Sequence, residues 1–361
     1  MARAVQLWRC GEPRGCEAMS ARRLLFFVAS IAVSAVSLVL ILRTVPFTDV
    51  VNSLSRTDPV YLLLSVLAVV LSLLTRAVRW WILLNRRISI LESFHMINVM
   101  FLGNQLPFRV GEVARGVLAT RRGLPLVTSG TSIIVERLID VLMLVILIAA
   151  TVSRMPAAPA ELTDQASLFG LLGFVGFLTL LVFAHAPDLA HRLLDKLLRA
   201  FKPLQRLPMK TMLSQLLDGL QPLKETRTLL WTALWTLLAW AAPLAALYFS
   251  HLALGIEVNY AISVPLGIAL TAISIALPVS IAALGPFEVA ILMTGRLVGM
   301  SDVDAIALGF LLHGLNVIIY AVWGTLGLLA LGASPAIAFG SNSEQPREGD
   351  YSRARNSCTN D

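Results

Sequence analysis

The chain has 361 residues, of which 57% are hydrophobic and only 14% are charged, and its mean hydropathy is +0.77. This composition excludes an ordinary soluble globular domain, in which about a quarter of the residues are charged. The formal net charge is +7, and the distribution of basic residues along a membrane protein indicates its topology.

Six apolar stretches are long enough to cross a bilayer, which takes about 20 residues. They cover 24–42, 60–84, 125–151, 168–184, 228–250 and 305–333. Two more apolar stretches, 90–122 and 260–297, are interrupted by proline and glycine. We interpret each as a helix–loop–helix hairpin that enters the bilayer and returns to the side it left. The predicted fold class is all-α: a polytopic membrane protein of about six full transmembrane helices plus two re-entrant helical hairpins.

The remaining segments are more polar. We expect 1–23 to be a cytoplasmic N-terminal tail, with Met1 and Met19 as alternative starts, and 334–361 to be a disordered cytoplasmic tail. The transmembrane domain then covers 24–333, with a cytoplasmic linker at 185–227. Within the linker, 188–201 has leucines on one helical face and charges on the other. Such a helix either lies in the membrane interface or packs on the protein's own inner surface.

Lys and Arg alternate between the two sides of this arrangement. There are five in 1–23, six in 85–126, eight in 185–227 and three in 334–361. The other connections hold two in 43–59, one in 151–167 and none in 251–259. Because short cytoplasmic loops are enriched in basic residues, both termini are predicted to be cytoplasmic.

One pattern occurs twice in the chain. Glu112, Gly123, Arg137 and Asp140 correspond to Glu288, Gly299, His313 and Asn316. Each partner lies 176 residues further along the chain. In the predicted topology, 60–84 and 228–250 cross in opposite directions. The halves 60–151 and 228–333 are therefore expected to form an inverted repeat, which is typical of transporters.

Charged and turn-forming residues concentrate in the first hairpin and in the span after it. These residues are Asn104, Pro107, Arg109, Gly111, Glu112, Arg115, Glu136, Arg137 and Asp140. Charge within apolar sequence marks a functional or paired site. If the chain turns at 107–111, the helix that begins near Glu112 points its N-terminus into the membrane and attracts an anion such as a lipid phosphate. Arg109 and Arg115 would add forked guanidinium donors to that site.

Several roles remain open at this stage. Glu112 and Glu288 are either caps of helix N-termini, proton-carrying carboxylates or ligands for a cationic headgroup. Arg137 either pairs with Asp140, three residues on, or reaches Glu112. His313 is either a hydrogen-bonded interior histidine or a proton site.

The run from Asn104 to Arg115, followed by Glu136-Arg137-Leu138-Ile139-Asp140, resembles the transmembrane region of the lysylphosphatidylglycerol synthases, a flippase-like family. The resemblance covers roughly 20–333, and Gly285-Pro286-Phe287-Glu288 matches the end of the family's second hairpin. It implies movement of lipids across the membrane. The synthases also carry a soluble aminoacyl-transferase domain after this region. The sequence up to Asp361 shows no such domain, so transferase activity is not expected.

The sequence thus predicts a multi-pass protein of the bacterial inner (plasma) membrane that binds or translocates an amphipathic lipid. That lipid would be an anionic phospholipid or a polyprenyl-phosphate-linked species. The substrate-binding candidates are the nine residues named above together with Gly285, Glu288, His313 and Asn316. The alternatives are an intramembrane lipid-modifying enzyme, with Glu112 and Asp140 as acid and base, and a lipid-presenting partner of a separate transferase.

The expected partners are membrane lipids, with a separate transferase or a homo-oligomer as further options, and no nucleic acid. No cofactor or metal is expected, because the sequence has no cluster of metal ligands and no nucleotide-binding loop. An enzyme is the less favoured reading, since no activated nucleophile stands out.

Overall fold

The computed structural model describes residues 30–39, 45–106, 109–155, 182–200, 209–220, 224–276 and 280–334, with Arg43 and scattered positions between 168 and 179. These residues contain helices and turns and no strand, which confirms the all-α prediction for the described chain. The elements are a helix Ser30–Val39, α2 (Phe47–Ser55), α3 (Pro59–Leu83), α4 (Ile90–Gly103), α5 (Val110–Arg121), α6 (Leu126–Val152), α8 (Pro187–Ala200), α9 (Met209–Leu220), α10 (Thr226–Ala253), α11 (Tyr260–Ala276), the 3₁₀ turn η5 (Ile281–Ala283), α12 (Pro286–Leu297) and α13 (Asp302–Leu331).

Three of the described helices, α3, α10 and α13, are long and apolar enough to cross a membrane. Helix α6 has 27 residues, which is also long enough, but it carries Glu136, Arg137 and Asp140 near its middle. The expected spans at 24–42 and 168–184 fall partly outside the described residues. The membrane character is therefore clear, while the expected number of six spans stays a prediction.

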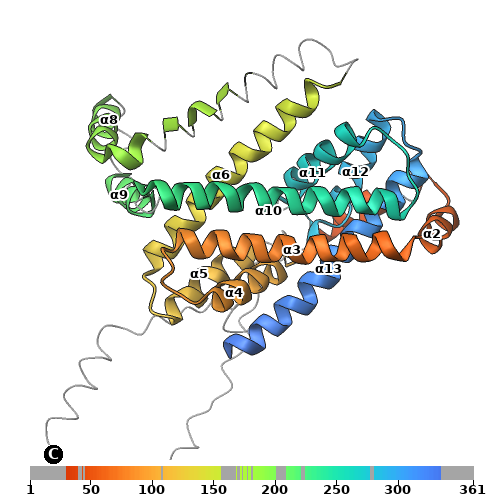
Figure 1. Cartoon of the computed structure of the whole chain (residues 1–361), viewed down its shortest axis with the longest axis horizontal. Helices are drawn as coiled ribbons and strands as arrows, with labels where there is room; N and C mark the ends of the chain where they lie inside the picture. The colour runs from red at the N-terminus through yellow and green to blue at the C-terminus, as the bar shows by residue number, and fades with distance from the viewer. Residues whose placement is uncertain are drawn as a thin grey trace, which may run out of the picture.

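Helices α3 and α10 lie side by side along most of their length and run in opposite directions (Figure 1). Helix α3 starts where it does because the Asp58 side chain accepts the N–H groups of Val60 and Tyr61, with Pro59 at the first helical position. Further along, the Ser65 hydroxyl donates to the Ala246 carbonyl at 3.0 Å. Small side chains at this contact let the two backbones approach closely.

Two pairs of shorter helices lie against these long helices. The first hairpin consists of α4 and α5, and the second hairpin of α11, η5 and α12. Helix α4 packs on α13, where a Cβ on Gly324 would stand 2.4 Å from the Leu102 side chain. Helix α11 in turn packs on α6. Each hairpin thus contacts a long helix that comes from the other half of the chain.

Helices α8 and α9 lie near the start of α10 (Figure 1). Ala190 and Leu198 of α8 are buried, and Ala190 packs with Leu217 and Leu220 of α9. Leu193 and Leu197, on the same apolar face, remain 45% and 44% exposed. The apolar face of α8 is therefore partly packed on the protein and partly free to meet lipid, so both readings of this helix keep support.

Candidate functional site

A cavity of about 300 Å³ lies where the long helices meet the ends of both hairpins. Most of its wall is apolar, from α3, α6, α10, α11 and α13. Six of the residues singled out from the sequence line it: Asn104, Arg109, Arg137, Asp140, His313 and Asn316. Gly111, Glu112, Arg115, Glu136, Gly285 and Glu288 do not line it, and Pro107 falls outside the described residues.

Arg79, a residue of α3 that the sequence analysis does not single out, binds two carboxylates beside the cavity. Its side chain is fully buried and donates to Asp140 at 2.6 and 3.2 Å and to Glu136 at 2.8 Å. Trp240 of α10 adds an indole N–H to Asp140 at 3.3 Å. These contacts hold the carboxylates of α6 against α3. The sequence does contain a signal that could have identified Arg79: it is a charged residue within an apolar span, about one helical turn after Arg76.

Arg115 does not reach the cavity. Its guanidinium is fully buried, 2.9 Å from Glu136, and its Cζ lies 4.6 Å from the centroid of the Trp80 ring. The Trp80 indole is itself fixed by a 3.0 Å hydrogen bond to Ser132. The expectation that Arg115 donates to a lipid phosphate beside Arg109 therefore lacks geometric support, and Arg115 instead binds α5 to α6.

Arg137 makes both of the pairings that the sequence left open. It contacts Asp140 at 3.3 Å and Glu136 at 3.4 Å, and its Nη1 lies 4.0 Å from Glu112. Glu112 also accepts a 3.0 Å bond from Arg109, which precedes α5 with a left-handed backbone, φ 51°. No side-chain cap is present at the start of α5. Glu112 therefore serves the arginines and does not cap its helix.

The groups around the cavity carry more positive than negative charge. Among the side chains that line it, three guanidinium groups (Arg76, Arg109 and Arg137) accompany one carboxylate (Asp140), a surplus of two positive charges. Arg76 lines the cavity and binds the Ser72 hydroxyl at 3.3 Å, with its Cζ 5.8 Å from the Phe101 ring centroid. Within the described chain it makes no ion pair, so it is the guanidinium best placed to receive an anion.

The second hairpin presents a different pair. His313 Nδ1 lies 2.5 Å from Glu288 Oε1, and His313 Nε2 lies 2.9 Å from the Ala282 carbonyl. The other oxygen of Glu288 accepts the Gly285 N–H at 2.7 Å. The cap reading of Glu288 is thus confirmed, and the same carboxyl group also binds His313. Asn316 donates to the Leu312 carbonyl at 2.9 Å and lines the cavity.

The two glycines among the candidates act through their lack of a side chain. A Cβ on Gly111 would stand 1.9 Å from the Met100 carbonyl oxygen, so glycine allows α5 to approach α4. Gly285 has φ +92°, and a Cβ there would meet Ser37 at 2.4 Å. At both positions a side chain would collide with a neighbouring segment, so glycine is needed for close packing. Position 285 also needs glycine because of its positive φ.

Replacing Arg79 should destabilise the fold more than replacing Arg137. Arg79→Met leaves two carboxylates buried beside α3, and such a loss costs about 3–5 kcal/mol. Arg137→Ala removes a side chain that is 35% exposed and leaves Arg79 in place, so it should cost about 1 kcal/mol or less. Thermal unfolding in detergent measures both, and adding Asp140→Asn to Arg79→Met should recover part of the loss. Equal stability of the two single variants would contradict this order.

The residues of this site all fall within the match to one family model. The family model described as "Lysylphosphatidylglycerol synthase TM region" matches residues 27–324. No curated protein and no solved structure matches the chain. The match covers both hairpins, the charge cluster of α3 and α6 and the Glu288–His313 pair, far more than half of the chain. The chain therefore belongs to the family of the lysylphosphatidylglycerol synthase transmembrane region.

Proposed function

We propose that the protein binds an amphipathic lipid in the cavity and moves its headgroup from one leaflet to the other. The observation that carries this is the surplus of two positive charges among the side chains that line a largely apolar cavity, with Arg76 in that lining and without an ion pair in the described chain. Arginine forks suit phosphate oxygens, and an apolar wall suits acyl or prenyl chains. The chemistry favours an anionic phospholipid or a polyprenyl-phosphate-linked lipid.

The arrangement of the helices supports an inverted repeat. Each half contains a long helix, a hairpin and a second long helix, and the first long helices, α3 and α10, are antiparallel. Corresponding residues also form corresponding contacts. Glu112 lies 4.0 Å from Arg137, and Glu288, 176 positions after Glu112, lies 2.5 Å from His313. Halves of opposite orientation around one site would allow access to alternate between the two sides of the membrane.

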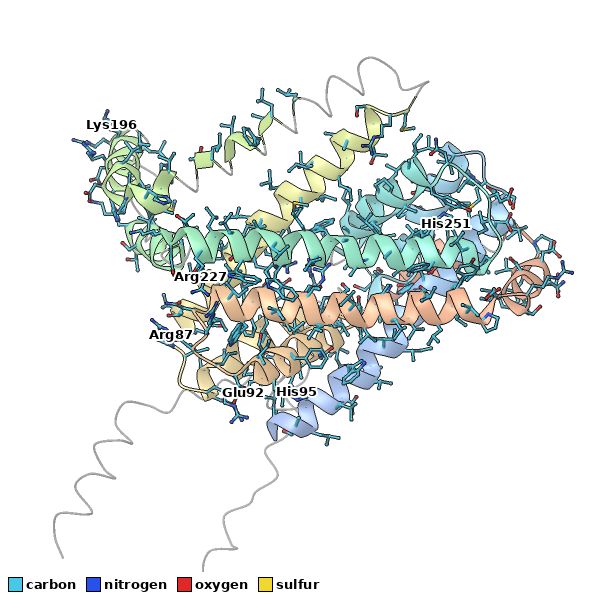
Figure 2. The ribbon with its side chains drawn as sticks, in the orientation of Figure 1. Arg87, Glu92, His95, Lys196, Arg227 and His251 are labelled. Atoms are coloured by element: carbon cyan, nitrogen blue, oxygen red, sulfur yellow. The ribbon has the colours of Figure 1, made fainter. Side chains whose placement is uncertain are left out.

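In the proposed topology the protein lies in a bacterial inner membrane, both termini are cytoplasmic and both hairpins are re-entrant. Arg87, Lys196 and Arg227 lie toward one end of the long helices and His251 toward the other (Figure 2). A basic end agrees with a cytoplasmic end.

The enzyme alternative has less support from the geometry. Asp140 would have to act as a base, yet its oxygens accept hydrogen bonds from Arg79 and Trp240 and face Arg137. Glu112 would have to act as an acid, yet it is paired with Arg109. A protein that presents lipid to a separate transferase would use the same cavity. The transport assay described below distinguishes lipid presentation from translocation.

Cysteine labelling tests the topology. If the hairpins are re-entrant, both ends of each hairpin lie on one side. Cysteines in place of Arg87 and Arg122, which flank the first hairpin, should react only from the cytoplasm. Cysteines in place of Glu257 and Ser301, which flank the second, should react from outside in intact cells. If the two ends of a hairpin react from opposite sides of the membrane, that hairpin is not re-entrant.

A transport assay tests the function. Purified protein in liposomes should redistribute a labelled anionic lipid between leaflets without changing its mass. Arg76→Ala should slow this about 10-fold or more, because a charge-assisted hydrogen bond contributes about 1.5–3 kcal/mol. Arg296→Ala is the matched control, since Arg296 is exposed, pairs with Asp302 and lies outside the cavity lining.

The other outcomes of this assay assign the alternatives. A chemically altered lipid without redistribution would favour the enzyme. Lipid binding that Arg76→Ala weakens, without redistribution or modification, would favour the lipid-presenting partner. Equal rates of lipid redistribution for Arg76→Ala and wild type would show that the lipid headgroup does not depend on Arg76 in this cavity.

A further inference from the structure

The contact between Glu288 and His313 must contain a proton. The Ala282 carbonyl can only accept a hydrogen bond, so the Nε2 atom of His313, 2.9 Å away, carries a hydrogen. The Gly285 N–H is likewise a donor, so it occupies Oε2 of Glu288. The remaining contact joins Nδ1 of His313 to Oε1 of Glu288 at 2.5 Å. Only a hydrogen between these two atoms makes that contact favourable.

This pair therefore holds one exchangeable proton, and it is neutral overall while it does so. Either the carboxylate faces an imidazolium, or a carboxylic acid donates to a neutral imidazole. Removal of the proton would leave a carboxylate oxygen against the lone pair of Nδ1. Glu288 is fully buried and His313 is 5% exposed, so water cannot relieve that repulsion without a movement of the chain.

The segment that would move is the tip of the second hairpin. Ala282, Ala283 and Gly285 all have positive φ, at 52°, 60° and 92°. Two of these are not glycine, so the turn costs energy and depends on its contacts. His313 provides one of them by binding the Ala282 carbonyl.

The same turn joins the two hairpins. The Ala282 N–H donates to the Gln105 carbonyl at the end of α4, at 3.0 Å. Arg109 reaches the Ala276 carbonyl at the end of α11, at 3.4 Å. The two tips thus close on each other at the cavity, and the His313 contact holds one side of that closure.

We propose that Glu288 and His313 form a proton-binding site, and that release of its proton to water separates the hairpin tips and opens the cavity. Protonation closes the tips again. The first half lacks such a site because Glu112 is paired with Arg109 and lies near Arg137, and the charges of both arginines are permanent. Opening is therefore linked to a proton on the second hairpin only. This proposal does not depend on the lipid that is carried.

Other ionisable groups line the same cavity, and their effect on a pH response must be distinguished from that of the Glu288–His313 pair. Helices α4, α10 and α11 contribute no acidic or basic side chain to its lining within the described residues. The groups that face the pair across the cavity are Arg76 of α3, Arg109 before α5, Arg137 and Asp140 of α6, and Tyr320 of α13. The arginines keep their charge at all ordinary pH values, so Asp140 and Tyr320 are the competing titratable groups.

Glu288→Gln isolates the pair. The glutamine amide oxygen can accept the Gly285 N–H, and its NH₂ group can donate to Nδ1 of His313. All the contacts of the pair then persist without a removable proton. Asp140 and Tyr320 are unchanged in this variant. Glu257→Gln is the matched control, because it makes the same chemical change at an exposed position between α10 and α11, outside the cavity lining.

The test measures the separation of the tips as a function of pH. Spin labels at Leu106 and Leu284, which are 46% and 37% exposed, would report the distance between the hairpins in full-length protein whose three native cysteines are serine. Distances are recorded in detergent, without added lipid, between about pH 5 and pH 9, a range that brackets the ordinary titration of histidine. Wild type and Glu257→Gln should gain a longer-distance population as the pH rises. Glu288→Gln should keep the short distance throughout.

Two results would overturn the proposal. One is a wild-type distance distribution that does not change with pH. The other is opening of Glu288→Gln that matches wild type, which would assign the response to Asp140 or Tyr320. Hydrogen exchange of 280–288 in unlabelled protein gives a second readout: at high pH this segment should be better protected in Glu288→Gln than in wild type. A failure of the transport assay would leave both of these readouts unaffected.

Discussion

The fold depends on the burial of two carboxylates, Glu136 and Asp140, in the middle of a helix that is otherwise suited to a membrane. Unpaired charge at that depth is too costly to persist. The structure meets this constraint with guanidinium groups from three directions: Arg79 from α3, Arg115 from α5 and Arg137 from α6 itself. Because each arginine comes from a different element, the ion pairs also fix how the first hairpin and the long helices are arranged.

Pairing alone does not account for the composition of this cluster. Among the described residues that line the cavity, three guanidinium groups, from Arg76, Arg109 and Arg137, stand beside a single carboxylate, that of Asp140. Arg76, which pairs with no carboxylate in the described chain, faces the cavity and not the packed interior. A buried pair is weak evidence for stability as such, since apolar residues could fill the same space at no loss. A surplus of positive charge next to an apolar cavity is better explained by an anionic partner that enters it, which is the basis of the proposed function.

Much of this could be predicted from the sequence. The 176-residue offset placed Arg137, Asp140, His313 and Asn316 in corresponding positions, and all four line the cavity. The proline and glycine interruptions predicted the two hairpins as helix pairs. Both results follow from local rules, namely the length of apolar runs and the conformations that glycine and proline favour.

The partners of the charges could not be predicted in the same way. Spacing within one helix suggested that Arg137 pairs with Asp140, but it could not show that Arg79, 61 positions before Asp140, makes the closer contact. Nearness in sequence likewise favours a shared role for Arg109 and Arg115, which the structure does not support. Arg109 precedes α5 and Arg115 lies more than a turn inside it, so their side chains point to different surroundings. Which arginine is paired and which is free depends on tertiary packing.

The proposed headgroup site lies within the membrane domain at the guanidinium of Arg76, which makes no ion pair in the described chain. An electron cryo-microscopy map of the full chain in nanodiscs made from the total polar lipids of the expression host would test it most directly. We expect density for a phosphate group in the cavity, within hydrogen-bonding distance of Arg76 and Arg137, with the lipid chains along the apolar wall. A well-resolved cavity that holds no headgroup, while lipid phosphates lie only at the bilayer surface, would contradict it.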